Sequence, residues 1–101
     1  MVNTVHQGDI LKIENIKSPV LVTSKDFFNE SRMIIGCPII EGSKAGALHI
    51  PIDTPTVRGV VYCEQLALFD LSVRGYSAID RIPIDDIINI TDAIQGIFDY
   101  I

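Results

Sequence analysis

The hydrophobic periodicity of this chain changes at Pro83, and the change limits the folds that the chain can adopt. Before Pro83, apolar residues come in short runs separated by turn residues, a pattern that predicts strands. After Pro83 they recur at steps of three and four, which predicts an amphipathic helix over about residues 84–100. The face of this helix is expected to carry Ile84, Ile87, Ile88, Thr91, Ile94, Ile97, Phe98 and Ile101. The chain is therefore predicted to be mainly β with one C-terminal α-helix.

Strands are expected at residues 10–13, 19–23, 33–40, 48–52, 59–63, 66–71 and 76–82. The run PVLVT at 19–23 is apolar nearly throughout, which favours a central strand covered on both sides. Pro38 is expected to mark the end of its strand or a bulge. In the alternating segment 48–52, His49 is expected to point outward. Residues 25–32 are expected to form a connection that turns Phe27 and Phe28 inward.

Composition indicates one globular domain over residues 1–101, with a small barrel at about 7–82. The chain is 48% hydrophobic and 21% charged, proportions that are typical of a compact domain. Cys37 and Cys63 lie in apolar runs without CxxC spacing, so they are interpreted as buried thiols, and neither a metal nor a cofactor is expected. No apolar run approaches the roughly 20 residues that span a bilayer, and the N-terminus lacks a targeting pattern, so no membrane association and a cytoplasmic location are predicted.

The formal net charge of −5 argues against nucleic-acid binding by bulk electrostatics. Up to Val60 the numbers of basic and acidic residues are equal, so the excess of negative charge lies in the segment after Val60. That segment contains only two basic residues, Arg74 and Arg81. Its seven acidic residues are Glu64, Asp70, Asp80, Asp85, Asp86, Asp92 and Asp99. Any anionic ligand is therefore expected to bind near the N-terminal half.

Several motifs along the chain resemble those of the MazF/PemK toxins. In the second half these are GVVYCEQ at 59–65, Asp70, Arg74-Gly75 and RIP at 81–83 before the helix. In the first half they are Gly8-Asp9-Ile10, SPVLV at 18–22 and CPII at 37–40. The resemblance implies an SH3-like β-barrel of the CcdB/PemK kind and the toxin half of a toxin–antitoxin pair. Homodimeric endoribonucleases that cut single-stranded mRNA without a metal are the best-known members.

The resemblance also implies site residues. The acid before the family's glutamine is Glu64 here, which would be the general base, and Arg74 stands at the family's Arg-Gly position. The chain departs from the family at Ser18, where an arginine is usual, at Ile40 in place of threonine, and at Tyr62 in place of a basic residue. Candidate substrate-binding residues on the same face are Lys17, Ser18, Ser43, Lys44 and His49.

Three functional hypotheses remain open. The first is an active endoribonuclease that uses Glu64, and the second is a binding module that keeps the fold and the antitoxin site without the chemistry. The third is a CcdB-like gyrase poison, for which the apolar C-terminal tip with Phe98 and Ile101 would be the contact. We expect these two residues instead to pack under the barrel. An acidic antitoxin tail is expected to lie between the loops 14–18, 41–47 and 53–58.

Overall fold

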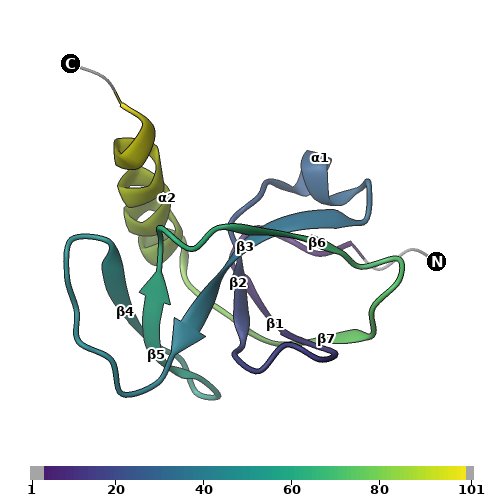
Figure 1. Cartoon of the computed structure of the whole chain (residues 1–101), viewed down its shortest axis with the longest axis horizontal. Coiled ribbons are helices and arrows are strands. Elements are labelled where there is room, and N and C mark those ends of the chain that lie inside the picture. Colours follow the sequence, from purple (N-terminus) through teal and green to yellow (C-terminus); the bar gives the residue numbers. More distant parts are fainter. Residues whose placement is uncertain (1–3, 100–101) are drawn as a thin grey trace.

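The computed structural model describes residues 4–99. They form a curled antiparallel sheet, a half-barrel, with one long helix at its C-terminal end (Figure 1). The seven expected strands are all present, so the mainly β prediction is confirmed. In chain order the elements are β1 (Asp9–Ile13), β2 (Val20–Val22), α1 (Asp26–Asn29), β3 (Met33–Ile40), β4 (His49–Asp53), β5 (Arg58–Tyr62), β6 (Ala67–Asp70), β7 (Tyr76–Arg81) and α2 (Ile84–Phe98).

The long strand β3 organises the sheet, whose order is β4-β5-β3-β2-β1-β7 with β6 also paired to β3. β6 pairs with the first half of β3, from Met33 to Gly36, and β5 pairs with its end at Ile39 and Ile40. The two strands therefore share one edge of β3 in succession. This division lets the β4–β5 hairpin turn away from the rest of the sheet (Figure 1).

Pro38 lies inside β3, so the prediction that it marks an end or a bulge is wrong. Its register with Val20 continues without a shift to Cys37 and Gly36. Ile39 donates its N–H to the Pro19 carbonyl at 2.9 Å, so the preceding nitrogen, that of Pro38, faces the opposite edge. That edge is unpaired there because β6 pairing stops at Gly36 and β5 pairing starts at Ile39. The missing N–H therefore breaks no ladder bond.

The core consists of two apolar clusters on the two faces of the central strands. Leu21 packs in one cluster with Ile10 and Val61, whereas Val20 and Val22 pack in the other. All three residues of β2 are buried, which confirms that this strand is covered on both sides. Cys37 and Cys63 are buried free thiols as predicted, and burial raises the pKa of Cys37 to about 12.

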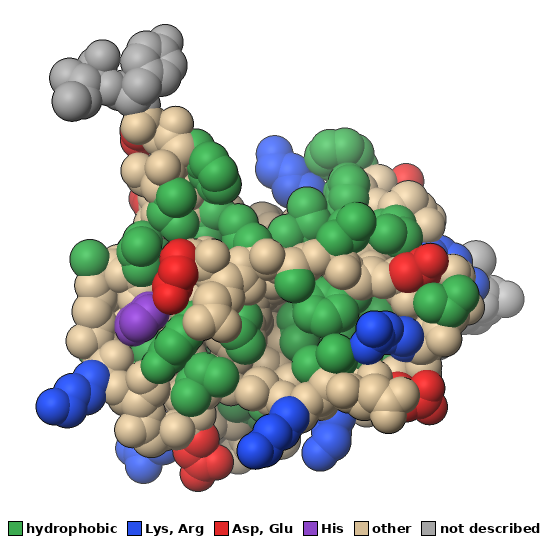
Figure 2. Space-filling view, in the orientation of Figure 1, with side chains coloured by type: hydrophobic (Ala, Val, Ile, Leu, Met, Phe, Trp, Pro, Cys, Tyr) green, Lys and Arg blue, Asp and Glu red, His purple; other side chains and the backbone are tan. Residues whose placement is uncertain are grey.

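Helix α2 meets the sheet by a face that shares Ile87, Thr91 and Ile94 with the predicted one but is centred on Ile90, which was not predicted. Its buried residue is Ile90, with Ile87, Ala93 and Ile94 partly buried beside it. Ile84 is 65% exposed and Phe98 is 70% exposed, so the expected packing of Phe98 under the barrel is wrong; Ile101 lies outside the described residues. The C-terminal half of α2 extends beyond the sheet, and apolar side chains line it (Figures 1 and 2).

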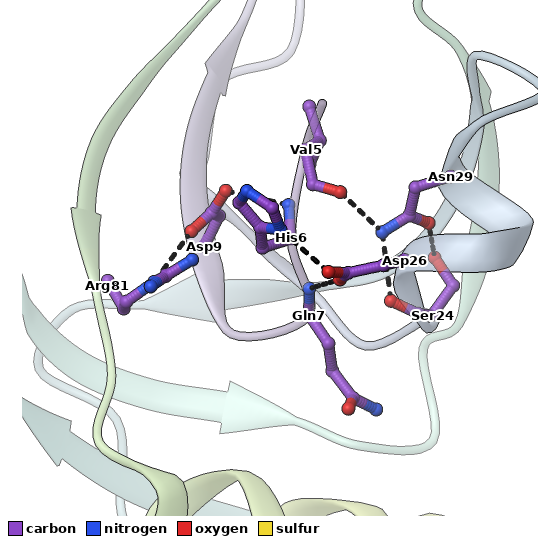
Figure 3. A network of polar contacts seen from close by, with 8 residues as sticks. All are labelled: Val5, His6, Gln7, Asp9, Ser24, Asp26, Asn29 and Arg81. Carbon is purple, nitrogen blue, oxygen red and sulfur yellow. Dashed lines mark hydrogen bonds and ion pairs between the residues drawn. The ribbon is translucent and has the colours of Figure 1, made fainter. Parts of the chain in front are cut away.

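The segment after β2 differs in part from the prediction, because Phe27 is 74% exposed on the short helix α1, whereas Phe28 is half-buried. Asn29 takes the buried position instead, and its side-chain N–H groups donate to the carbonyls of Val5 at 2.9 Å and Ser24 at 3.0 Å. His6 contacts the adjacent Asp26 through Nδ1 at 2.7 Å (Figure 3). A polar network, rather than aromatic packing, therefore joins the N-terminal segment to α1.

Candidate functional site

The β4–β5 hairpin places His49 directly opposite Tyr62. Both backbone groups of His49 bond to Gly46, at 2.9 and 3.2 Å, and not to Tyr62. Side chains of such a non-hydrogen-bonded pair approach each other closely. The two rings stack with their centroids 3.9 Å apart and their planes inclined by 10°. His49 thus lies on the outer face of the hairpin, as the alternation predicted.

Glu64 follows β5 and reaches the same histidine. The Cys63 N–H donates to the Leu48 carbonyl at 2.9 Å, which keeps the chain beside β4 after β5 ends. Glu64 Oε2 lies 3.0 Å from His49 Nε2, with both side chains about one-third exposed. The hydrogen bond from His49 lowers the pKa of Glu64. The result is an ionised carboxylate bonded to an imidazole at the surface, a pair able to exchange protons with a ligand.

Ser43 connects the loop 41–47 to this pair, because its hydroxyl is hydrogen-bonded to the Tyr62 hydroxyl. We call Ser43, Tyr62, His49 and Glu64 the histidine–glutamate cluster. A histidine and an acidic side chain are adjacent over the β4–β5 hairpin in Figure 2. Next to the cluster is a groove lined by Glu41, Gly42, Ser43, Pro51, Ile52, Asp53, Arg58, Gly59 and Val60.

A second groove brings together residues of the loops 41–47 and 53–58 with Pro19, which directly follows the loop 14–18; these three loops were expected to receive an antitoxin. Its lining residues are Pro19, Ile39, Glu41, Thr56, Val57, Arg58 and Ile79. It shares Glu41 and Arg58 with the first groove. Ser18 directly precedes Pro19, and Lys17 is exposed. Lys44 is exposed on the loop 41–47, and neither lysine forms an ion pair within residues 4–99.

Arg74 does not join the cluster. Glu64 precedes β6 and Arg74 follows it, so the two residues lie beyond opposite ends of that strand. Arg74 is exposed in the β6–β7 turn and forms no ion pair with any residue that the structure describes. The alternative in which Arg74 braces the sheet through Asp70 is wrong, because Asp70 instead accepts hydrogen bonds from Ser72, the backbone one at 2.9 Å.

Comparison with protein families identifies the chain. The profile of the family described as "PemK-like, MazF-like toxin of type II toxin-antitoxin system" matches residues 6–98. The chain belongs to this family. No curated protein sequence matches the chain significantly. Within residues 4–99, no three His, Cys, Asp or Glu side chains gather as metal ligands would, and no helix is long and apolar enough to cross a membrane.

Solved structures share the fold of this MazF/PemK toxin. A MazE–MazF complex of Deinococcus radiodurans superimposes with a TM-score of 0.85 at 18% identity, covering 96% of this chain and 98% of that one. A mycobacterial endoribonuclease in complex with its cognate antitoxin superimposes with a TM-score of 0.80 at 10% identity, covering 93% of this chain and 94% of that one. The Mycobacterium tuberculosis toxin MazF-mt6 superimposes with a TM-score of 0.75 at 19% identity, covering 91% of this chain and 99% of that one. The predicted family and its fold are thereby confirmed.

In this MazF/PemK toxin, Tyr62 contacts both His49 and Ser43, which the sequence motifs did not predict. In the sequence, Tyr62 is notable only as the replacement of a basic side chain. The signal available in the sequence was its spacing from Glu64, since residues two apart on a strand share a face. Its position opposite His49 depends on the β4–β5 register, which the sequence pattern did not specify.

Proposed function

We propose that this MazF/PemK toxin is an endoribonuclease that cuts single-stranded mRNA without a metal, acting in the cytoplasm as a homodimer. The observation that supports the proposal is the hydrogen bond between Glu64 and His49 beside an open groove. Two titratable groups in contact can supply the base and the acid that RNA cleavage by its own 2′-hydroxyl requires.

In the proposed reaction, the Glu64 carboxylate takes the proton of the ribose 2′-hydroxyl. The 2′-oxygen bonds to phosphorus, the bond from phosphorus to the 5′-oxygen breaks, and protonated His49 donates a proton to that oxygen. The products are a 2′,3′-cyclic phosphate and a 5′-hydroxyl. Cationic groups are needed to stabilise the charge that develops on the phosphate; Lys44 and Lys17 near the grooves are proposed for this role, together with the hydroxyls of Ser18 and Ser43. Phosphate binding by Arg74 stays a prediction.

The test is incubation of the purified protein with a long single-stranded RNA in EDTA. Discrete fragments that end in a 2′,3′-cyclic phosphate are expected. If the RNA stays intact while the protein still binds its antitoxin, the binding module without chemistry replaces the ribonuclease.

The proposed partner is an antitoxin whose acidic, disordered tail lies in the groove between the loops 14–18, 41–47 and 53–58. The meeting of Pro19, Glu41 and Arg58 in one groove supports this location. Reversing both nearby charges, Lys17→Glu with Lys44→Glu, is expected to slow association, most strongly at low salt. An association rate that does not change with these charges would remove the electrostatic part of the proposal.

A second candidate function, the poisoning of DNA gyrase, is favoured by one observation. Phe98 is 70% exposed near the end of α2, where an apolar contact with another protein is available. A gyrase cleavage assay tests it. Stabilised cleavage complexes that disappear in Phe98→Ser would support this candidate, and their absence with the wild-type protein would dismiss it.

A further inference from the structure

We propose that Tyr62 is a positioning residue that couples the loop 41–47 to the Glu64–His49 pair. The coupling follows from the contacts of one side chain, whose ring lies against His49 and whose hydroxyl bonds to Ser43. Its effect on catalysis rests on the proposed ribonuclease function. The coupling itself can be measured without RNA cleavage.

The ring of Tyr62 fixes the plane of the His49 imidazole. His49 makes one side-chain hydrogen bond within the described part of the chain, from Nε2 to Glu64. A single bond at one ring nitrogen leaves the imidazole free to tilt about that bond. Stacking at 3.9 Å and 10° removes this freedom, and the electron-rich face of a tyrosine also attracts a cation such as an imidazolium.

The hydroxyl of Tyr62 fixes the Ser43 end of the loop, whose Gly46 end is bonded to the His49 backbone. Among the described residues, Ser43 makes the only side-chain hydrogen bond that the loop 41–47 forms, and its partner is Tyr62. Glu41, Gly42 and Ser43 also line the groove beside the cluster. A ligand in that groove therefore touches a loop that is fastened to the same tyrosine that orients His49.

This arrangement assigns separate tasks to the two parts of Tyr62. Loss of the hydroxyl frees the Ser43 end of the loop, while Gly46 at its other end stays bonded to the His49 backbone. We expect this change to weaken ligand binding, whereas loss of the ring lets His49 tilt and slows proton transfer. Tyr62→Phe and Ser43→Ala remove the hydroxyl contact from either side, and Tyr62→Leu removes both contacts. Tyr76→Phe is the matched control. Tyr76 packs against the core cluster that contains Val20 and Val22, and its hydroxyl forms no hydrogen bond within residues 4–99.

The experiment combines kinetics with two structural measurements on the folded variants. In Tyr62→Phe and Ser43→Ala, we expect a KM about threefold to tenfold higher with kcat retained, the size of one net hydrogen bond. In Tyr62→Leu, we expect kcat to fall about 10- to 100-fold, as for a displaced catalytic group. Phenylalanine thus rescues kcat where leucine does not, and Tyr76→Phe changes neither constant.

The structural measurements decide the coupling even when no RNA is cut. In Tyr62→Phe, amide hydrogen exchange should speed up in the loop 41–47, and the NMR signals of the His49 ring should keep the upfield shift that a stacked aromatic ring imposes. In Tyr62→Leu those ring signals should move downfield. Unchanged loop exchange in Tyr62→Phe, or unchanged His49 signals in Tyr62→Leu, overturns the proposal. Wild-type protein that cuts no RNA overturns only the ribonuclease function.

Discussion

The Glu64 carboxylate accepts a hydrogen bond from His49, and this contact is where acid–base chemistry is expected. Glu64→Gln keeps the size and the hydrogen-bonding capacity of the side chain but cannot take a proton. RNA cleavage is therefore expected to fall about 10²- to 10⁴-fold, the usual effect of losing a positioned general base. Single-turnover cleavage of a labelled RNA measures the rate.

Thermal melts of the same variant are the control. Glu64 is at the surface, so the melting temperature should stay close to that of the wild type. A variant that lost stability and activity together would indicate a structural role for Glu64.

Arg74 gives a different prediction because its side chain forms no ion pair or hydrogen bond with residues 4–99. If it binds phosphate by two parallel hydrogen bonds, Arg74→Lys should reduce cleavage, since a lysine is a point charge without that geometry. The exposed position of Arg74 predicts an unchanged melting temperature. Full activity in Arg74→Lys would show that the turn 71–75 has no part in the proposed bidentate phosphate binding.

At the scale of elements, the docking of α2 onto the sheet depends on Gly8. Its φ of +94° is unfavourable for other residues, and an added Cβ would lie 2.5 Å from Ile87 Cδ1 on α2. Gly8→Ala is expected to destabilise the fold by about 2–4 kcal/mol, the sum of a left-handed backbone and overpacking. Urea unfolding at equilibrium measures this change.

Gly96 on the same helix is the matched comparison, because a Cβ added there meets no atom within 4 Å. Gly96→Ala should stabilise the protein by about 0.5–1 kcal/mol, since alanine has the higher helix propensity. Equal effects at the two glycines would contradict the close contact between Gly8 and Ile87.

At the scale of the whole molecule, surface carboxylates make the fold sensitive to acid. The pKa values of Asp26 and Asp70 are lowered, mainly by hydrogen bonds from His6 and Ser72 respectively. A group whose folded pKa is depressed contributes stability that is present above its unfolded pKa and is lost as the pH falls through the folded pKa. Stability is therefore expected to decrease below about pH 4, near the ordinary Asp value.

Urea midpoints at pH 7, 4 and 3 measure this loss. Asp26→Asn should flatten the dependence, because it removes the ionised acceptor of the bond to His6 (Figure 3). The same pH profile in Asp26→Asn as in the wild type would show that this network does not contribute to acid sensitivity.

The exposed apolar residues predict a homodimer. Phe27, Leu68, Val73, Ile84, Ile88 and Phe98 are each at least half exposed, and the mean hydropathy of the chain is +0.33. Apolar surface of this kind in a small domain favours association between copies. Light scattering at high micromolar concentration should give twice the mass of the chain, 11.1 kDa; a monomeric mass would contradict the prediction.

The positions of the strands, the helix and the buried thiols were predictable from the order of the residues. Strand and helix periodicities reflect local backbone geometry, in which side chains alternate along a strand and recur every 3.6 residues along a helix. The apolar stretch of β2 likewise indicated burial on both sides. These features need no knowledge of which segments meet.

The orientation of α2, the exposure of Phe27 and the contacts that Tyr62 makes in the histidine–glutamate cluster required the folded chain. Both faces of α2 carry isoleucines, so packing against the sheet selected Ile90 and left Ile84 at the surface. Asn29 displaced Phe27 from the interior because its amide satisfies two backbone carbonyls there. Ser43, His49 and Tyr62 are separated along the sequence and meet only through the β4–β5 register and the folding back of the loop 41–47. Such contacts depend on long-range pairing, which a local pattern does not encode.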